Sequence, residues 1–331
     1  MDERVLTGDR VTGKLHLGHY VGSLKNRVEL QNNYDIFIEL ADVQALTTHF
    51  DKPEMLKKNV RNITMDYLAS GIDPEKSTIF VQSLIPEIAE LTVYYSMFVT
   101  VSALRHNPTT KSEAEAHGYK DLYYGFLGYP VSQAADITFC KAKLIPVGDD
   151  QLPHIEQTRR IVRRFNQLYH PVLIEPEALI SEVPRLVGLD GNNKMSKSLG
   201  NAIQLDTTEQ DVNEKIKNAK TDPARVHKND LGHPEVCPIY AYHRIFRSEG
   251  ADEICESCKK GTIGCMECKK KIALSINHLL EPMRQRRADY LKKPEIVDEI
   301  LIAGTQRARK VAKETMREVR EAMNLDYFCS K

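Results

Sequence analysis

The sequence predicts an α/β protein in which a doubly wound parallel sheet is followed by an all-α region. Three observations lead to this prediction. Short apolar runs alternate with helical patterns in the first half of the chain, strand signals fade after about residue 200, and the later segments show helical periodicity. Strands that alternate with helices form a parallel sheet with helices on both faces, and such sheets bind ligands at the carboxyl ends of their strands.

The expected strands are short apolar runs that end in a turn or a polar residue, and they lie at 4–8, 35–42, 77–81 and 144–148. The expected helices lie at 18–31, 53–70, 207–220, 269–280 and 295–323, with an arginine-rich helix after residue 148. A loop at 190–193 stands close to the change in pattern. We therefore expect an α/β domain over residues 1–200 and a helical domain over residues 201–331.

The composition is that of an ordinary globular chain. The 331 residues include 46 lysines and arginines and 46 aspartates and glutamates, and 41% of the residues are hydrophobic. These values exclude a disordered or collagen-like chain, and no apolar run approaches the roughly 18 residues of a membrane span. The first residues are charged and lack an apolar segment, which predicts a cytoplasmic protein without a signal peptide.

The first chemical motif, at residues 7–19, lies between an expected strand and an expected helix. Gly18 opens the helix N-terminus, whose free N–H groups and partial positive charge suit a phosphate. His16 and His19 are three residues apart, so their imidazoles share one side of the first helical turn and can donate to phosphate oxygens. A surface turn with incidental histidines is the alternative interpretation.

The second motif, at residues 191–201, is a loop rich in glycine and asparagine in which Lys194 and Lys197 flank Met195 and Ser196. Two ammonium groups on such a loop can close over a polyphosphate and stabilise the charge that develops on it. Taken alone, the segment is better explained as an exposed linker.

Cysteines form a third pattern, because five of the seven lie within residues 237–268. Two C-x-x-C pairs are formed by Cys255, Cys258, Cys265 and Cys268, and Cys237 lies upstream. Such pairs bind one tetrahedral zinc ion or an iron–sulfur cluster, and their spacing does not distinguish the two. An odd number of cysteines in a chain of this length favours a reducing compartment over disulfide bonds.

The pairing of H-x-G-H with K-M-S-K-S at the end of an α/β domain is typical of class I aminoacyl-tRNA synthetases. The chain resembles the tryptophanyl-tRNA synthetases over nearly its whole length. The segments that carry this resemblance are the two motifs and 40–42, 129–136, 146–151, 221–225 and 264–269. The resemblance implies a Rossmann-like catalytic domain followed by a helical domain that binds the tRNA anticodon.

The resemblance implies a two-step reaction. L-Tryptophan and ATP form tryptophanyl-adenylate and pyrophosphate, and the tryptophanyl group then moves to the 3′-terminal ribose of tRNA(Trp). The implied catalytic residues are His16, His19, Lys194 and Lys197. ATP, accompanied by Mg²⁺, is expected to contact Arg10, Val11, Thr12, Gly18, His19, Gly148, Asp149, Asp150, Leu186, Lys194, Met195, Ser196, Lys197 and Ser198.

For the amino acid, the resemblance places Asp136 at the indole N–H, where a substrate without that donor would leave a buried carboxylate unpaired. The other expected contacts of the amino acid are Leu6, Gln44, Tyr129, Gln133, Val147 and Gln151. Ordinary strand core is the alternative for Leu6 and Val147. Two positions depart from the family pattern, since Gln44 replaces a common histidine and Glu113 a frequent lysine.

A bacterial subset of the family holds a [4Fe–4S] cluster with an upstream cysteine and C-x6-C-x2-C. This pattern implies Cys237, Cys258, Cys265 and Cys268 as ligands. The gap between Cys237 and Cys258 is shorter than in that subset, so Cys255 stays open as the fourth ligand and Zn²⁺ as the metal. The resemblance also implies a homodimer with tRNA reaching across both subunits, and no membrane partner.

Three other functions fit parts of the sequence. A tyrosyl-tRNA synthetase shares the architecture, and its carboxylate would accept a hydrogen bond from a phenol. An adenylyltransferase without tRNA also uses H-x-G-H, although the K-M-S-K-S segment speaks against it. A duplicated synthetase can become a binding or regulatory protein, but the presence of His16, His19 and Asp136 favours retained chemistry.

Overall fold

The computed structural model describes residues 3–180, 186–191, 195–196, 199–227 and 229–328. It contains a five-stranded sheet in the order β3-β2-β1-β4-β5, and every adjacent pair is parallel. The strands are β1 (Arg4–Arg10), β2 (Asp35–Ala41), β3 (Ser77–Val81), β4 (Leu144–Val147) and β5 (Glu177–Ile180). The prediction of a doubly wound parallel sheet is confirmed.

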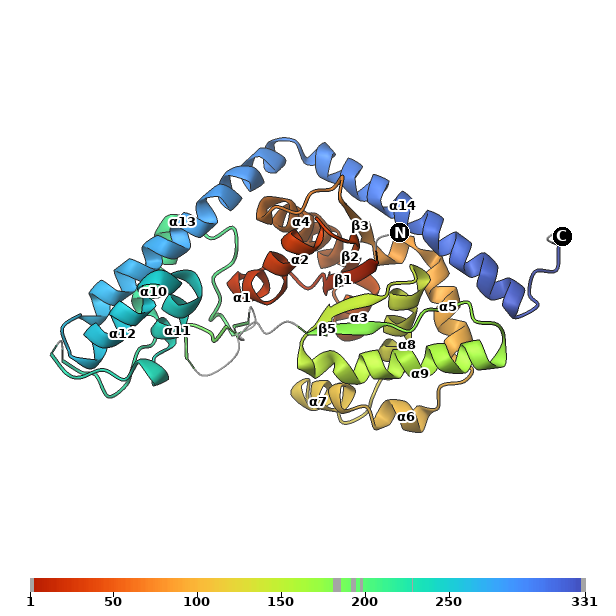
Figure 1. Cartoon of the computed structure of the whole chain (residues 1–331), viewed down its shortest axis with the longest axis horizontal. Coiled ribbons are helices and arrows are strands. Elements are labelled where there is room, and N and C mark those ends of the chain that lie inside the picture. The colour runs from red at the N-terminus through yellow and green to blue at the C-terminus, as the bar shows by residue number, and fades with distance from the viewer. Residues whose placement is uncertain (1–2, 181–185, 192–194, 197–198, 228, 329–331) are drawn as a thin grey trace.

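Helices cover both faces of this sheet, and a second group of helices follows after residue 208 (Figure 1). The first group is α1 (Leu17–His19), α2 (Lys25–Leu30), α3 (Asp42–His49), α4 (Glu54–Ser70), α5 (Pro86–Ser96), α6 (Val101–Arg105), α7 (Pro108–Ala116), α8 (Tyr124–Phe139) and α9 (Leu152–Leu168). The second group is α10 (Glu209–Asn218), α11 (Pro238–Phe246), α12 (Ala251–Lys259), α13 (Cys265–Lys292) and α14 (Pro294–Ala322). Of this second group, the helices from α10 to the start of α13 lie away from the sheet, while α14 returns to it.

The strand order reverses between β1 and β4, because β2 and β3 follow β1 on one side while β4 and β5 lie on the other. Such a reversal opens a crevice outside the carboxyl ends of the two central strands. β1 ends at Arg10 and β4 ends at Val147. The segments that follow these two residues therefore meet at the crevice where a ligand of this fold binds.

Each face of the sheet has its own hydrophobic cluster. Alternate residues of a strand point to opposite faces, so Val5 of β1 and Leu6 of β1 belong to different clusters. The cluster with Val5 includes residues of α4 and α13, and the cluster with Leu6 includes residues of α5, α8, α9 and α14. Because both faces of the sheet are covered, β2 and β3 are buried almost throughout. Their apolar runs could therefore be recognised as strands from the sequence.

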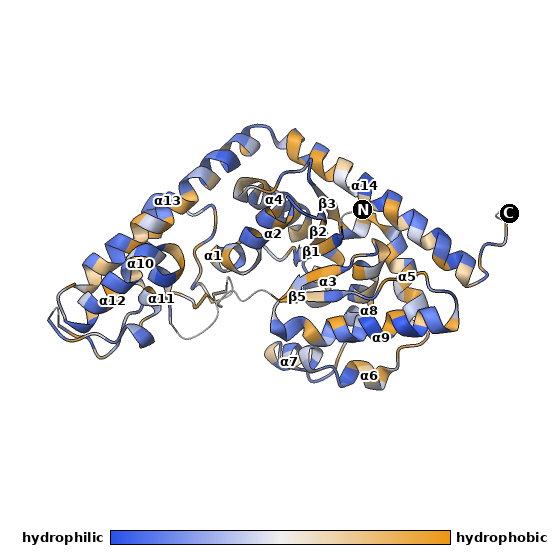
Figure 2. Cartoon of the chain, in the orientation of Figure 1, coloured by the Kyte–Doolittle hydropathy of each residue, from blue (hydrophilic) through white to orange (hydrophobic). Residues whose placement is uncertain are grey.

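The two longest helices join the second group of helices to the sheet. α13 packs against α4, and α14 returns along β3, which is an edge strand (Figure 1). The backbone N–H of Val81 donates to Oγ1 of Thr305 at 3.3 Å, so α14 covers part of this edge. Both helices alternate hydrophilic and hydrophobic residues, as helices with one buried face do (Figure 2). The domain boundary at residue 200 stays a prediction.

The structure differs from the expected elements in three places. β5 has no counterpart among the expected strands, because its four residues are half-buried or exposed and its place comes from pairing with β4. The expected helix 18–31 is divided into α1, a π-helical turn (Tyr20–Leu24) and α2. The expected helix 269–280 is the middle of the longer α13. Within the described residues, no helix is both long and apolar enough to cross a membrane.

Candidate active site

The segment after β1 brings the two histidines of the first motif together. His16 is the N-cap of α1, and its Nδ1 accepts a hydrogen bond from the backbone N–H of Gly18 at 3.1 Å. Nδ1 of His19 accepts from the backbone N–H of His16 at 3.2 Å, and the two ring centroids lie 3.8 Å apart. Because both Nδ1 atoms are acceptors, the neutral rings carry their proton on Nε2. The turn thus holds two side-chain N–H donors beside a helix N-terminus.

Met195 of the second motif and the segment directly after this motif lie against the turn. The backbone N–H of Leu17 donates to the carbonyl oxygen of Ile203 at 2.9 Å, and that of Leu205 donates to the carbonyl oxygen of Leu15 at 3.1 Å. Buried Met195 approaches Gly18, since a Cβ atom at position 18 would lie 3.5 Å from Cβ of Met195. The two motifs, about 180 residues apart in the chain, therefore form one surface.

The structure describes Met195 and Ser196 of the second motif. The backbone N–H of Met195 donates to the carbonyl oxygen of buried Leu186 at 3.1 Å, and the backbone N–H of Ser196 donates to Oδ1 of Asn201 at 2.8 Å. The remaining expected residues of this motif, Lys194, Lys197 and Ser198, lie outside the described residues.

The other expected ATP contacts lie at the two strand ends. Arg10 donates from Nη2 to Oγ1 of Thr48 at 2.5 Å, and its buried Nε has no hydrogen-bond partner in the described part of the chain. Val11 is buried, and the backbone N–H of Thr12 donates to the carbonyl oxygen of Arg10 at 2.8 Å. Across the crevice, exposed Gly148, Asp149 and Asp150 follow β4, the latter two in a 3-10 turn (Asp149–Gln151).

Asp136 of α8 is the buried acceptor of the site. Its side chain is 2% exposed; Oδ1 accepts from Nε2 of Gln82 at 2.9 Å, and Oδ2 accepts from Nε2 of Gln44 at 3.2 Å. Gln44 also donates its backbone N–H to Oε1 of Gln82 at 3.1 Å, which closes the triangle. Burial raises the pKa of Asp136 to about 6, although the two amide donors act in the opposite direction.

Three expected amino-acid contacts, Tyr129, Gln133 and Asp136, lie on one side of α8, because they follow one another at intervals of four and three residues. The hydroxyl of Tyr129 donates to Oε2 of Glu113 at 2.8 Å and lies 2.9 Å from Nε2 of His154. Burial lowers the pKa of His154 to about 4, so this imidazole is neutral at pH 7. Gln133 is half-buried, and its role stays as the resemblance implies it.

The remaining expected amino-acid contacts lie on the sheet or just after it. Buried Leu6 of β1 and half-buried Val147 of β4 belong to the cluster on the α8 side. Half-buried Gln151 ends the 3-10 turn after β4. All three therefore lie on the α8 side of the sheet or at the crevice.

Two residues of this site are missing from the sequence analysis. Gln82 directly follows β3, where a polar residue after a buried strand is a recognisable signal. Glu39 lies inside β2, is 7% exposed and hydrogen-bonds Asp136. A glutamate within an apolar strand is rare unless it is paired, so its presence in the run 35–42 was a signal for function.

The cysteines form a second candidate site, in the second group of helices. Burial raises the pKa of Cys268 to about 12, and the charges of Cys237, Cys258 and Cys265 act in the same direction. These four thiols therefore lie near one another, whereas Cys255 hydrogen-bonds Tyr240. Among the described residues, no three potential ligands are as close together as the ligands of one metal ion.

One cation lies beside the four thiols, although burial raises the pKa of Cys258 as it does that of Cys268. Nη1 of Arg225 donates to Sγ of Cys258 at 3.5 Å. A Cβ atom at position 232 would lie 2.3 Å from the same sulfur, so only glycine leaves Cys258 its present place. Nε2 of His243 lies 3.3 Å from Sγ of Cys268, and burial lowers the pKa of this imidazole to about 4.

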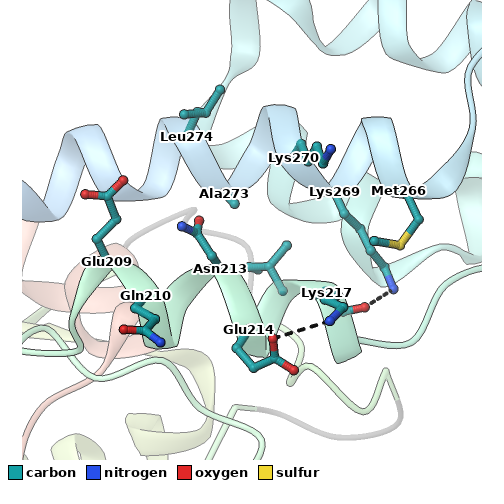
Figure 3. Close-up of a pocket in the computed structure, with 11 residues that line it drawn as sticks. Glu209, Gln210, Asn213, Glu214, Lys217, Met266, Lys269, Lys270, Ala273 and Leu274 are labelled. Atoms are coloured by element: carbon teal, nitrogen blue, oxygen red, sulfur yellow. Dashed lines mark hydrogen bonds and ion pairs between the residues drawn. The ribbon is translucent and has the colours of Figure 1, made fainter.

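A groove of about 740 Å³ lies between α10 and α13, and its lining residues Met266 and Lys269 are sequence neighbours of Cys265 and Cys268. Figure 3 shows Glu209 and Asn213 of α10 pointing toward α13, whereas the ammonium group of Lys217 pairs with Glu214 of the same helix. Lys269 of α13 points across to α10 and donates from Nζ to the carbonyl oxygens of Lys217 at 2.8 Å and Ala219 at 2.6 Å. The groove is thus closed at one end by a buried ammonium group that binds the C-terminal carbonyls of α10.

Comparisons relate the chain to known proteins. The family model for class I tRNA synthetases (W and Y) matches residues 2–281. A tryptophan–tRNA ligase from Thermotoga maritima is 48% identical over 326 residues, which span 97% of this chain and 99% of that protein. The tryptophan–tRNA ligase of Lactococcus lactis subsp. lactis is 47% identical over 335 residues, which span 98% of each chain.

Solved structures of synthetases are similar to this chain in fold. The tryptophanyl-tRNA synthetase from Campylobacter jejuni, complexed with ADP and tryptophan, superposes with a TM-score of 0.87 at 32% identity and covers 97% of this chain and 100% of that chain. A tyrosyl-tRNA synthetase from Archaeoglobus fulgidus, complexed with L-tyrosine, has a TM-score of 0.67 at 23% identity over 86% of this chain and 90% of that chain, and thus shares the fold.

Proposed function

The chain belongs to the tryptophan–tRNA ligases, a class I aminoacyl-tRNA synthetase family, and we propose that the surface formed by its two motifs carries the chemistry at ATP. The enzyme activates L-tryptophan with ATP to tryptophanyl-adenylate and pyrophosphate, and it then transfers tryptophan to tRNA(Trp). The relatives favour tryptophan over tyrosine as the substrate and a tRNA ligase over an adenylyltransferase. Charging of tRNA(Trp) separates the enzyme from a duplicated synthetase that serves as a binding protein.

Adenylate formation needs positioning and charge stabilisation rather than a protein nucleophile. A carboxylate oxygen of tryptophan attacks the α-phosphorus of ATP, and the bond to the pyrophosphate oxygen breaks. In our proposal, His16 and His19 donate from Nε2 to phosphate oxygens, supported by the observed Nδ1 acceptors. Lys194 and Lys197 bind the departing pyrophosphate, which Mg²⁺ accompanies as part of the nucleotide substrate.

The other nucleotide contacts follow from the crevice between β1 and β4. We assign the phosphate and ribose side to the segment after β1 and to the acidic turn after β4, where carboxylates can accept from ribose hydroxyls. Buried Met195 and Leu186 would pack against the adenine. The full proposed set is Arg10, Val11, Thr12, Gly18, His19, Gly148, Asp149, Asp150, Leu186, Lys194, Met195, Ser196, Lys197 and Ser198.

We assign recognition of the indole N–H to Asp136. The support is its burial and its two fixed amide donors, Gln44 and Gln82, which orient the carboxylate without neutralising it. Tyr129, Gln133 and Gln151 are assigned to the ammonium and carboxylate side of the amino acid, and Leu6 and Val147 to the ring. A buried carboxylate left without its donor is costly, so phenylalanine would be rejected strongly.

We also propose a metal centre held by Cys237, Cys258, Cys265 and Cys268, with a [4Fe–4S] cluster as the first choice and Zn²⁺ as the alternative. All four donors are thiols, which suit either group, and Arg225 beside Cys258 favours thiolate charge. Bound there, the group would supply cross-links between α11, α12 and α13 rather than a chemical step.

The assembly and the location are further parts of the proposal. We propose a homodimer, supported by large apolar side chains that are more than half exposed between residues 84 and 101: Leu84, Val93, Met97 and Val101. tRNA(Trp) would reach across the two subunits, and the lysines near the cysteines would contact its phosphates. We place the enzyme in the cytoplasm, where the free thiols observed here persist.

The observation that carries the proposal is the contact of Met195, and of the segment directly after the second motif, with the His16–His19 turn. Amino-acid-dependent pyrophosphate exchange tests the first step, and charging of purified tRNA(Trp) with labelled tryptophan tests both. We expect exchange with tryptophan and not with tyrosine, and a loss of at least about 100-fold in kcat for His19→Ala (about 2.7 kcal/mol). Exchange unchanged by His19→Ala would refute the assigned role of the turn.

A further inference from the structure

Glu39 and Asp136 form a pair of buried carboxyl groups in the candidate active site. Glu39 lies on β2 and Asp136 on α8, and their side chains are hydrogen-bonded to each other. They are 7% and 2% exposed, and within the described residues neither forms an ion pair with a lysine or arginine. Two carboxyl groups this close cannot both be ionised, so they share one proton.

The surroundings decide which carboxyl group holds this proton. Asp136 receives two side-chain N–H donors, from Gln44 and Gln82, and these stabilise its ionised form. Oε1 of Glu39 is buried and accepts no hydrogen bond from any residue that the structure describes, and Asp42 adds further negative charge nearby. An ionised Glu39 would thus be a buried charge without compensation, and its pKa lies well above the usual range. The proton belongs to Glu39.

The register of β1 and β2 places Glu39 on the α8 side of the sheet. β1 and β2 are paired in parallel with Gly8 opposite Glu39 and Leu6 opposite Phe37, so these four residues share one face. At Gly8 a Cβ atom would lie 2.8 Å from Cβ of Glu39, which means that β1 leaves this place free of a side chain. Glu39 therefore packs tightly against Gly8 and lies on the same side of the sheet as Leu6 and α8.

We propose that Glu39 is a positioning residue for tryptophan, which as a neutral acid donates its O–H to Asp136 and fixes that carboxylate as the acceptor of the indole N–H. An ionised carboxylate has about four acceptor positions. Gln44, Gln82 and Glu39 occupy three of them, which leaves one for the substrate. The inference rests on the proposed role of Asp136 and adds a residue that the family resemblance does not supply.

The test compares two substrates that differ in the indole N–H. L-Tryptophan carries this donor, and L-3-benzothienylalanine has sulfur in its place. We measure kcat/KM for both in pyrophosphate exchange with the wild type, Glu39→Leu, Glu39→Gln and Asp136→Asn. For Glu39→Leu we expect kcat/KM for tryptophan to fall about 10- to 100-fold, mainly through KM, and that for the analogue to fall less than about 3-fold. The KM for ATP should not change.

The glutamine variant separates positioning from mere packing. Its side-chain amide is neutral and donates like the protonated acid, so Glu39→Gln should keep the preference for tryptophan within about 3-fold. Loss of the preference in Glu39→Gln, or its survival in Glu39→Leu, would overturn the inference. If Glu39→Leu does not fold, the glutamine variant still decides, and Glu39→Met serves as a second donor-free variant.

Asp136→Asn distinguishes this inference from the proposed function beneath it. If Asp136 accepts the indole N–H, this variant loses the preference for tryptophan over the analogue. A preference that survives Asp136→Asn refutes the role of Asp136 itself. A preference lost in Asp136→Asn but kept in Glu39→Leu refutes the role of Glu39 alone.

Discussion

Gln44 of α3 donates its side-chain amide to Oδ2 of Asp136 on α8 at 3.2 Å, across 92 residues of sequence. The same Nε2 atom lies 3.5 Å from the carbonyl oxygen of Tyr129. The family resemblance expects a histidine at position 44, and either side chain can supply one N–H donor to the carboxylate. The substitution therefore preserves the donor that Asp136 needs, while it removes a group that could become positively charged.

We predict that Gln44→Leu weakens tryptophan binding. Without this donor the ionised Asp136 loses one of its two amide partners, and the KM for tryptophan should rise about 10-fold, which corresponds to about 1.4 kcal/mol. Steady-state pyrophosphate exchange measures this change. Gln44→His is the matched control and should stay within about 3-fold of the wild type. A leucine variant with unchanged KM would show that Gln82 alone orients the carboxylate.

The activity should depend on the ionisation of Asp136. The pKa of this buried carboxyl lies near 6, and the carboxyl groups of Glu39 and Asp42 face it. Below that pH Asp136 gains a proton, and it then accepts the indole N–H less well. We expect kcat/KM for tryptophan to fall as pH decreases through about 6, whereas the KM for ATP does not follow. In Asp136→Asn this inflection should be absent; its persistence there would assign it to another group.

Cysteine variants test the proposed metal centre and its fourth ligand. Cys237 lies near the other three thiols, whereas Cys255 hydrogen-bonds Tyr240. Cys237→Ser should lower the bound metal of anaerobically purified protein at least about 10-fold, and Cys255→Ser should leave it unchanged. Metal analysis and the visible absorption spectrum give the readout. Colourless protein with one zinc per chain would show that the bound metal is zinc and not an iron–sulfur cluster. Loss of metal in Cys255→Ser but not in Cys237→Ser would show that Cys255 is the fourth ligand.

The sequence predicted the elements whose signal is local. β2 and β3 are buried on both faces, and their apolar runs marked them directly, while β5 is half-exposed and becomes a strand through pairing with β4. α14 shows clear helical periodicity in the sequence. Its packing along β3 was not predictable from that pattern, because the pattern defines a buried face but not its partner.

The same limit applies to the site. Resemblance grouped Gln44 with Asp136, and the structure shows their hydrogen bond. Glu39 and Gln82 were not predicted as site residues, because their partner Asp136 lies on α8, 97 and 54 residues further along the chain. A polar residue in a buried strand signals a partner, but only the crossing of α8 over the sheet identifies that partner as Asp136.

The ion pair between Arg287 of α13 and Asp66 of α4 should stabilise the fold. Nη1 of Arg287 donates to Oδ1 of Asp66 at 2.6 Å, and both side chains are buried. Oδ2 of Asp66 accepts the backbone N–H of Leu15, so the pair also supports the segment that leads to His16. Arg287→Met leaves a buried carboxyl without its cation and should reduce the free energy of unfolding by about 3 kcal/mol.

Thermal and denaturant unfolding measure the effect of Arg287→Met, with Arg317→Met as the control. Arg317 forms an exposed ion pair with Glu314, and its removal should reduce the free energy of unfolding by less than about 1 kcal/mol. The double variant Arg287→Met with Asp66→Asn should recover part of the loss, since the buried charge is gone. Equal effects of the two arginine variants would contradict the role of burial.

Lys269 should stabilise the junction of α10 and α13, where it lies beside exposed Lys270 (Figure 3). Burial lowers the pKa of Lys269, and its ammonium group binds the carbonyl oxygens of Lys217 and Ala219. Lys269→Met keeps the side-chain volume but leaves these carbonyls without their donor, which should reduce the free energy of unfolding by about 1–3 kcal/mol. Lys270→Met removes the same charge from solvent and should change it by less than about 0.5 kcal/mol. Denaturant titrations of the two variants measure the difference, and equal losses would mean that charge rather than hydrogen bonding at the end of α10 sets the stability.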